Sequence, residues 1–319
     1  MSRRAFVIGL GAVLAAPLTV EASQAGNMYR VGWLAPAAIP ENLQAVRDGL
    51  RALGYVDGTT LVIDQRYAAG KKPLAAAAAE MLQSRPAVIV TDGSVAAIAV
   101  KANAAAIPVV FVSGDPIGMG LVPSLSRPGG NLTGLALIST ELNVKRLGLL
   151  KEAFPNVSRL GILYEARQAK LMIPPIDAGA RSLGLSVTHL EVRDVEDIEP
   201  AFAAALRKRV EAVMPLSSAL LDAKKQRLVI LAGKHRLPAI YEHRPFPKAG
   251  GLMSYGPDIQ EVFRRAARYV DRILKGARPA ELPVEQATKF ELVSNLRTAN
   301  ALGVSIPQSV LLRADQIIE

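Results

Sequence analysis

The chain has 319 residues, of which half are hydrophobic and only 21% are charged, and this composition excludes a disordered protein. Its length suits two domains of ordinary size, and its few aromatic residues (5%) favour helices alternating with buried parallel strands. The net charge of +10 comes from scattered basic residues without an arginine-rich arm, so we expect no nucleic-acid partner.

The N-terminus has the pattern of a cleavable export signal. Two arginines precede an uncharged run at 5–20, and small residues follow it. The run is shorter than the about 20 residues of a membrane-spanning helix. The paired arginines leave the general and the twin-arginine export routes open. We expect residues 1–25 to be a signal peptide, a mature N-terminus between Ser23 and Asn27, and a soluble periplasmic protein.

Strand-like and helical segments alternate after this signal. The predicted order is a strand at 29–35, a helix at 41–53, a strand at 61–67, a helix at 74–83, a strand at 87–91, a helix at 95–105 and a strand at 108–112. This alternation is typical of βαβ units that form a parallel sheet.

The pattern starts again after a helix predicted at 141–154. The second series is a strand at 159–164, a helix at 176–183, a strand at 185–191, a helix at 198–207, a strand at 211–216, a helix at 220–234 and a strand at 238–241. Short motifs recur in the same order in both series: Arg51-Ala-Leu-Gly54 resembles Arg181-Ser-Leu-Gly184. The repetition favours two similarly built lobes.

Three extended segments lie where the chain would pass between the lobes, at 131–137, 250–256 and 288–295, and a helix is predicted at 258–275. Several crossings would form a hinge that bends while the lobes stay together. We therefore predict an α/β protein with two doubly wound parallel-sheet lobes and a multi-crossing hinge. Lobe 1 would comprise 28–133 and 257–290, and lobe 2 would comprise 138–254 and 295–319.

The sequence offers no recognisable catalytic set. The three histidines, His189, His235 and His243, form no metal-binding pair, and no nucleophile elbow or phosphate-binding loop occurs. The chain has no cysteine, which excludes disulfides, thiolate metal ligands and a lipid-anchored cysteine. We expect a protein that is not an enzyme and that holds no cofactor and no metal.

Ligands of open α/β sheets bind beyond the carboxyl ends of the strands, and two such edges would face each other here. The candidate ligand-binding residues are Pro36, Asp92, Ser94 and Asp115 on the first lobe, Tyr164, Ser217, Ser218 and Tyr241 on the second, and Tyr255 at a crossing.

Three of these candidates, Ser94, Ser218 and Asp115, have an ordinary structural role as an alternative. Ser94 and Ser218 precede predicted helices, where a serine caps the helix and the neighbouring N–H groups suit a carboxylate. Asp115 would hold an ammonium or hydroxyl group, or it would only stabilise its Gly-Asp-Pro turn. The tyrosines would stack on an apolar or aromatic ligand. Asp222 is expected on a solvated helix face.

Several longer motifs resemble a known family. They are Gly49-Leu-Arg-Ala-Leu-Gly-Tyr55, Ile107-Pro-Val-Val-Phe-Val-Ser-Gly-Asp-Pro116, Leu125-Ser-Arg-Pro-Gly-Gly-Asn-Leu-Thr-Gly134, Ala249-Gly-Gly-Leu-Met-Ser-Tyr-Gly256 and Thr288-Lys-Phe-Glu-Leu-Val293. They resemble the tryptophan/tyrosine-type extracytoplasmic solute-binding proteins of ABC transporters. The resemblance implies a type I periplasmic-binding fold, hinge closure on a small organic solute, and delivery to ABC permease and ATPase subunits in the inner membrane.

Two turns on the second lobe depart from the family pattern. Tyr164-Glu-Ala-Arg-Gln168 replaces an Asn-Pro-Asn-Asn-Pro-like turn, and Pro215-Leu-Ser-Ser218 replaces an Ala-Asp-Pro-like turn. The expected solute is an amino-acid-like molecule or an aromatic carboxylate, bound by a monomer. A periplasmic ligand sensor for a membrane signalling partner is the alternative, because it would use the same fold.

Overall fold

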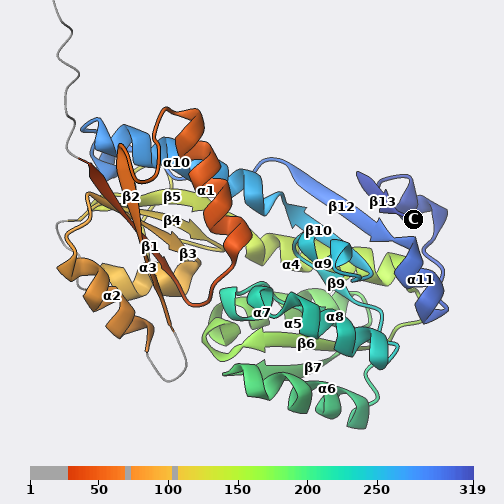
Figure 1. The fold of residues 1–319 in the computed structure, drawn as a ribbon. Helices are drawn as coiled ribbons and strands as arrows, with labels where there is room; N and C mark the ends of the chain where they lie inside the picture. The colour runs from red at the N-terminus through yellow and green to blue at the C-terminus, as the bar shows by residue number, and fades with distance from the viewer. Residues whose placement is uncertain (1–27, 69–72, 103–106) are drawn as a thin grey trace, which may run out of the picture.

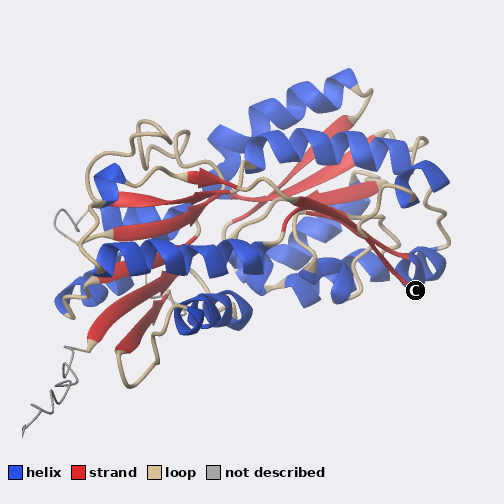
Figure 2. Ribbon diagram, turned by 90° about the horizontal axis from the view of Figure 1, so that it is seen from above, coloured by secondary structure: helices blue, strands red, loops and turns tan. Residues whose placement is uncertain are grey.

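The computed structural model describes residues 28–68, 73–102 and 107–319, so the predicted signal peptide at 1–25 lies outside the described residues. The chain forms two α/β lobes that lie side by side, each with a central sheet covered by helices (Figure 1 and Figure 2). The predicted alternation of strands and helices is confirmed in both series.

The first lobe contains a six-stranded sheet in the order β11-β5-β4-β3-β1-β2, and all of its pairings are parallel. Its strands are β1 (Tyr29–Ala35), β2 (Leu61–Tyr67), β3 (Val88–Asp92), β4 (Val109–Ser113), β5 (Leu132–Ala136) and β11 (Glu285–Gln286). The strand β5 pairs with β4 over its full length, from Leu132 to Ala136.

Two helices cover each face of this sheet. On one face lie α1 (Pro40–Ala52) and α10 (Ile259–Leu274), and on the other lie α2 (Leu74–Gln83) and α3 (Ser94–Lys101). Successive residues of a strand point to opposite faces. Trp33 therefore packs on Phe263 of α10, with ring centroids 5.6 Å apart, while the next residue, Leu34, joins the core on the other face.

The second lobe has two short sheets that one β-bridge, between Val213 and Ala239, joins edge to edge. The first has the order β7-β6-β8, and the second has the order β13-β12-β10-β9 with β12 antiparallel to β10. The strands are β6 (Arg159–Glu165), β7 (Ser186–Val192), β8 (Ala212–Pro215), β9 (Ile240–Tyr241), β10 (Met253–Pro257), β12 (Phe290–Asn295) and β13 (Gln316–Ile318).

Helices again cover both faces of these sheets. One face carries α4 (Ser139–Ala153), α5 (Ala169–Ser182), α11 (Leu296–Leu302) and α12 (Gln308–Leu311), and the other carries α6 (Ile198–Arg207), α7 (Ala219–Ala223), α8 (Lys225–Lys234) and α9 (Pro245–Lys248). The chain end, β13, pairs with β12 and so belongs to this lobe's second sheet.

The described residues pass between the lobes three times. Residues 137–138 lead from β5 to α4, Asp258 leads from β10 to α10, and residues 287–289 lead from β11 to β12. At the first crossing, Ile138 has φ +50, a left-handed conformation that is strained for a β-branched residue. The crossing is held because Ser139 N–H donates to Gly114 C=O at 3.0 Å.

Two predicted helices differ from those observed. The helix predicted at 220–234 is divided at Lys224 into α7 and α8, although neither Gly nor Pro marks the break. The helix predicted at 176–183 begins at Ala169 and continues through Pro174 and Pro175. Proline usually interrupts a helix because it cannot donate a backbone hydrogen bond, which is why the pattern predicts a later start.

Candidate functional site

A cavity lies between the lobes, at the carboxyl ends of the strands. Its lining contains residues of both lobes: Pro36, Asn42, Asp92, Gly93, Ser94, Val95, Val112, Gly114, Met119, Leu137 and Ile259, together with Ser139, Glu165, Arg167, Gln168, Met172, Ser217, Ser218, Ala219, Asp222 and His243. It encloses about 790 Å³ of space free of atoms, part of which is open to solvent. Concave sites with apolar walls and a few polar groups are typical of small-molecule binding, so the lining suits a small solute.

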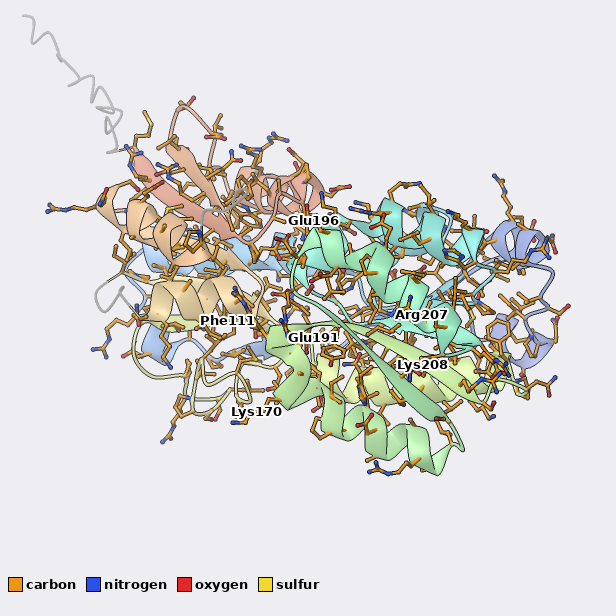
Figure 3. All side chains as sticks on the ribbon, turned by 90° about the horizontal axis from the view of Figure 1, so that it is seen from below. Phe111, Lys170, Glu191, Glu196, Arg207 and Lys208 are labelled. Carbon is orange, nitrogen blue, oxygen red and sulfur yellow. The ribbon has the colours of Figure 1, made fainter. Side chains whose placement is uncertain are left out.

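The basic residues at the end of α6 lie away from this cavity. Figure 3 shows Lys170 and Glu191 on the side of the second lobe that faces the first, whereas Arg207 and Lys208 lie on the far side. Arg207 and Lys208 are exposed. The local cluster of positive charge is therefore a solvated surface and not part of the cavity.

The N-terminus of α3 opens onto the cavity. Gly93 caps this helix with φ +86, a conformation that a side chain would strain, so Ser94 is the first helical residue and not the cap. The Ser94 hydroxyl lies 2.7 Å from the hydroxyl of Ser113, at the end of β4. The N–H groups of a first helical turn have no partner within the helix, and the helix dipole makes this end positive. The turn at Gly93–Val95 can therefore receive an anionic group.

Ser217 and Ser218 line the opposite wall. Ser218 is the N-cap of α7, because its hydroxyl accepts a hydrogen bond from Leu221 N–H at 3.2 Å. The Ser217 hydroxyl lies 2.7 Å from Asp222 Oδ2 and 3.1 Å from His243 Nε2. Ser217 thus connects two titratable side chains of the cavity wall.

The prediction that Asp222 lies on a solvated helix face is wrong. The residue is partly exposed as a whole, but its Oδ1 atom is buried and has no hydrogen-bond partner among the described residues. Burial raises the pKa of Asp222 well above its ordinary value, against the effect of the Ser217 hydrogen bond. Asp222 lies on the short α7 and contributes to the lining of the cavity.

Asp92 is the acidic residue of the first-lobe wall. It ends β3, and its Oδ2 atom accepts a hydrogen bond from Asn42 Nδ2 at 3.0 Å. Burial raises the pKa of Asp92 to about 6, and the Asn42 hydrogen bond acts against this increase. Asp92 therefore titrates close to neutrality.

Three further titratable groups line the cavity. Burial raises the pKa of Glu165, which lies 3.9 Å from the largely exposed Arg167. Burial lowers the pKa of His243, while the neighbouring Glu242 acts in the opposite direction. His243 is therefore neutral near pH 7, and Arg167 is the only cationic side chain among the lining residues that the structure describes.

A buried ion pair supports the floor of the cavity. Arg146 of α4 donates to Glu242 at 2.9 Å and to the carbonyl of Tyr255 at 2.8 Å. Glu242 also accepts a hydrogen bond from the hydroxyl of Ser139 at 2.8 Å, and neither member of the pair is appreciably exposed. The network fixes the start of α4 to the loop after β9.

Five of the nine candidate residues lie in the lining: Pro36, Asp92, Ser94, Ser217 and Ser218. The other four do not. The carboxylate of Asp115 accepts a hydrogen bond within its own turn, from Gly118 N–H at 2.8 Å. It accepts another from the hydroxyl of Thr140, on α4, at 3.4 Å.

The three tyrosines pack inside the second lobe. Tyr241 stacks on Phe246 with ring centroids 4.4 Å apart. Tyr164 and Tyr255 belong to the core on the other face of the sheet, and Tyr255 also contacts Phe290. The apolar part of the cavity is instead formed by aliphatic and methionine side chains, which residue type alone did not indicate.

The lining residues that the candidates omit include Asn42, Met119, Glu165, Gln168, Met172 and His243. A signal for some of them was present in the sequence. The turn at 164–168 and the turn at 215–218 were the two places where the chain departed from the family pattern, and both contribute residues to the lining.

The comparisons with known proteins agree with this architecture. A family model described as ABC transporter substrate binding protein matches residues 34–318. The chain belongs to this family. It is 23% identical over 256 residues to a protein named tyrosine-binding protein from Clostridioides difficile (strain R20291), and the match covers 79% of this chain and 73% of the relative.

Two solved structures resemble the substrate-binding protein over nearly its whole length. A conserved domain protein from Vibrio cholerae has a TM-score of 0.84 and 27% identity, covering 91% of this chain and 100% of its own. An ABC domain in complex with L-Trp from Streptococcus pneumonia has a TM-score of 0.82 and 25% identity, covering 92% and 100%. More distant ABC solute-binding proteins share the fold, so the predicted type I periplasmic-binding fold is confirmed.

None of the helices in the described ranges has the length and hydrophobicity to cross a bilayer. The described residues also contain no group of three or more His, Cys, Asp or Glu side chains that could hold a metal ion.

Proposed function

We propose that this protein captures an amino-acid-like or aromatic carboxylate solute in the periplasm and delivers it to the permease and ATPase subunits of an ABC importer, without catalysing a reaction. The observation that carries this proposal is the cavity between the lobes, because both lobes contribute polar and apolar residues to one small site. A site shared in this way couples ligand binding to closure about the three crossings.

The carboxylate of the solute would bind at the N-terminus of α3. Gly93 and the first residues of α3 line the cavity, and the positive end of the helix dipole favours an anion. The apolar part of the solute would lie against Met119 and Met172, since methionine side chains adapt to aromatic and aliphatic groups. The relatives named for tyrosine and L-Trp support an aromatic amino acid as the first compound to test.

We also propose roles for the candidate residues that were predicted from the sequence. Pro36, Asp92, Ser94, Ser217 and Ser218 would contact the solute, whereas Asp115 and the three tyrosines would have structural roles. The proposal also includes export by the segment at 1–25 and a monomeric mature protein. Mass analysis of periplasmic protein should give an N-terminus between Ser23 and Asn27, and light scattering after gel filtration should give a monomer's mass.

The decisive experiment is native mass spectrometry of the protein purified from its own periplasm, followed by calorimetry with the compound that co-purifies. We expect a small organic solute, and a smaller radius of gyration by small-angle scattering when it is bound. A solute that binds at saturation without changing the scattering profile would contradict closure. A tightly bound macromolecule in place of a solute would contradict the proposal as a whole.

A further inference from the structure

Two carboxylates of the cavity come from opposite lobes. Asp92 ends β3 in the first lobe, and Asp222 lies on α7 in the second, yet both line the same cavity. The negative charge of Asp92 contributes to the raised pKa of Asp222, which places the two groups within electrostatic reach of each other. Like charges on facing lobes repel, so in the empty cleft either closure is opposed or one of the two carboxyl groups stays protonated.

Neither carboxylate has the hydrogen bonds that a buried anion needs. The Oδ1 atom of Asp222 is buried and has no partner in the part of the chain that the structure describes, while its Oδ2 atom accepts from Ser217. The hydrogen bond from Asn42 reaches only Oδ2 of Asp92, and no other hydrogen bond to Asp92 occurs among the described residues. A buried polar atom without a partner is costly and requires an explanation, such as a ligand that completes it.

The surrounding side chains do not supply the missing positive charge. Arg146 is paired with Glu242, and Lys225, although it acts on Asp222, lies 3.1 Å from Glu41. Arg167 is largely exposed and lies beside Glu165. Burial lowers the pKa of His243, so its ring is neutral near pH 7. Among the described residues, the cavity wall therefore has no free cationic side chain that could neutralise Asp92 and Asp222.

We propose that Asp92 and Asp222 form a seat for a cationic nitrogen of the solute, and that this charge is required to hold the two lobes closed. The ligand class is accordingly a primary amine or amino acid, and not a simple carboxylate. This inference rests on the proposed function and narrows it. An ammonium group has three donors and no acceptor, so it can complete Oδ1 of Asp222 and the free oxygen of Asp92 at once.

The expected consequence is strong selection against molecules that lack the nitrogen. Such a molecule would leave two carboxyl groups of one cavity buried without a cationic partner when the cleft closes. Sites built to hydrogen-bond a polar group reject the analogue without it by about 10⁴-fold or more. We therefore expect at least a 100-fold preference for the amine over its matched amine-free analogue.

Three probes with one aromatic ring system test this: L-tryptophan, tryptamine and indole-3-propionate, measured by calorimetry at pH 7.5. L-Tryptophan and tryptamine should bind, and indole-3-propionate should bind at least 100-fold more weakly. Equal or tighter binding of indole-3-propionate would overturn the cation seat while leaving solute capture intact. Binding of tryptamine without binding of L-tryptophan would instead contradict the carboxylate site at α3 and leave the cation seat standing.

Asp92→Asn and Asp222→Asn should each weaken binding of the amine probes at least tenfold. Asp48→Asn is the matched control, because Asp48 lies on the exposed face of α1 and bonds Gln44 and Arg51. It should leave the affinity unchanged. Asparagine variants at positions 92 and 222 that bind as tightly as the wild type would overturn the proposal.

A measurement without ligand decides the matter if none of the three probes binds. Carboxylates that are kept for a ligand destabilise the empty protein, so Asp92→Asn and Asp222→Asn should raise Tm at pH 8 by at least about 2 °C. Asp48→Asn should not raise it. A lowered Tm for both cavity variants would show that the carboxylates serve the fold, and the proposal would be wrong.

Discussion

Lys225 on α8 lies 3.1 Å from Glu41 on α1, so one ion pair joins the second lobe to the first beside the cavity. Both side chains also line a smaller recess that shares Asn42, Asp222 and His243 with the main cavity. Because its two members belong to different lobes, this ion pair forms only when the lobes are close together.

Glu41→Gln should weaken solute binding by about two- to fivefold, because a partly exposed ion pair contributes ~0.2–1 kcal/mol. The loss should appear in the dissociation rate, measured by stopped-flow fluorescence, and should shrink at high salt. Glu281→Gln, which removes the exposed pair with Arg278 within one lobe, is the control and should have no effect. A tenfold or larger loss would mean that Glu41 does more than join the lobes.

Arg146→Met should cost about 3–5 kcal/mol of unfolding free energy, because it leaves Glu242 buried without its partner. Adding Glu242→Gln to this variant should recover much of the loss, since the second change removes the unpaired charge. Urea unfolding of the two variants and of the wild type measures both steps. A single variant that loses less than about 1 kcal/mol would show that water or another residue replaces the guanidinium group.

Asp92 should make the empty protein less stable as the pH rises from about 4 to 6. Its pKa is raised to about 6 by burial, against ~3.9 in an unfolded chain, so in this window the native state binds more protons. The destabilisation is complete above pH 6 and amounts to about 2–3 kcal/mol. It disappears as the pH falls below ~4.

Urea unfolding of Asp92→Asn and the wild type between pH 4.5 and 7.5 tests this dependence. The variant should be the more stable protein above pH 6, and its advantage should shrink at lower pH. His243 contributes equally to both proteins, so the difference between their unfolding free energies excludes its effect. This effect has the opposite sign because the pKa of His243 is lowered. A difference in stability that does not change with pH would contradict the raised pKa of Asp92.

Ser94→Pro should weaken binding of a carboxylate solute at least about tenfold, because proline removes the N–H group at the first position of α3. The helix itself should persist, since proline is favoured at that position. Ser94→Ala is the control, because it keeps the N–H group and loses only the hydroxyl contact with Ser113. Calorimetry that gives the same affinity for both variants would place the carboxylate elsewhere.

The lobes were predictable because their strands are short apolar runs, such as Val109–Ser113, bounded by turn residues. The position of Asp92 at a strand end was predictable for the same reason. Asp222 was not, because the pattern predicts one continuous helix at 220–234 and does not indicate which of its faces meets the cavity. The break at Lys224, with φ −106 and ψ 20, is marked by no Gly or Pro.

The tyrosines show a second limit of sequence analysis. Tyr241 does lie at the end of a strand, but β9 has only two residues, so hydrophobic alternation cannot indicate which way its side chain points. The ring turns into the core and stacks on Phe246. Asp115 illustrates the same limit in a loop. The direction of its side chain decides whether it binds a ligand or the backbone of its own turn, and the sequence does not indicate that direction.

The three crossings also determine the order in which the chain can fold during its synthesis. The first lobe requires α10, whose Phe263 covers Trp33, and β11, which completes the edge of its sheet. Ribosomes make these elements only after nearly the whole second lobe. A nascent chain that has reached Pro257 therefore still exposes the apolar face of its N-terminal sheet, and we expect this intermediate to depend on chaperones or on export before it collapses.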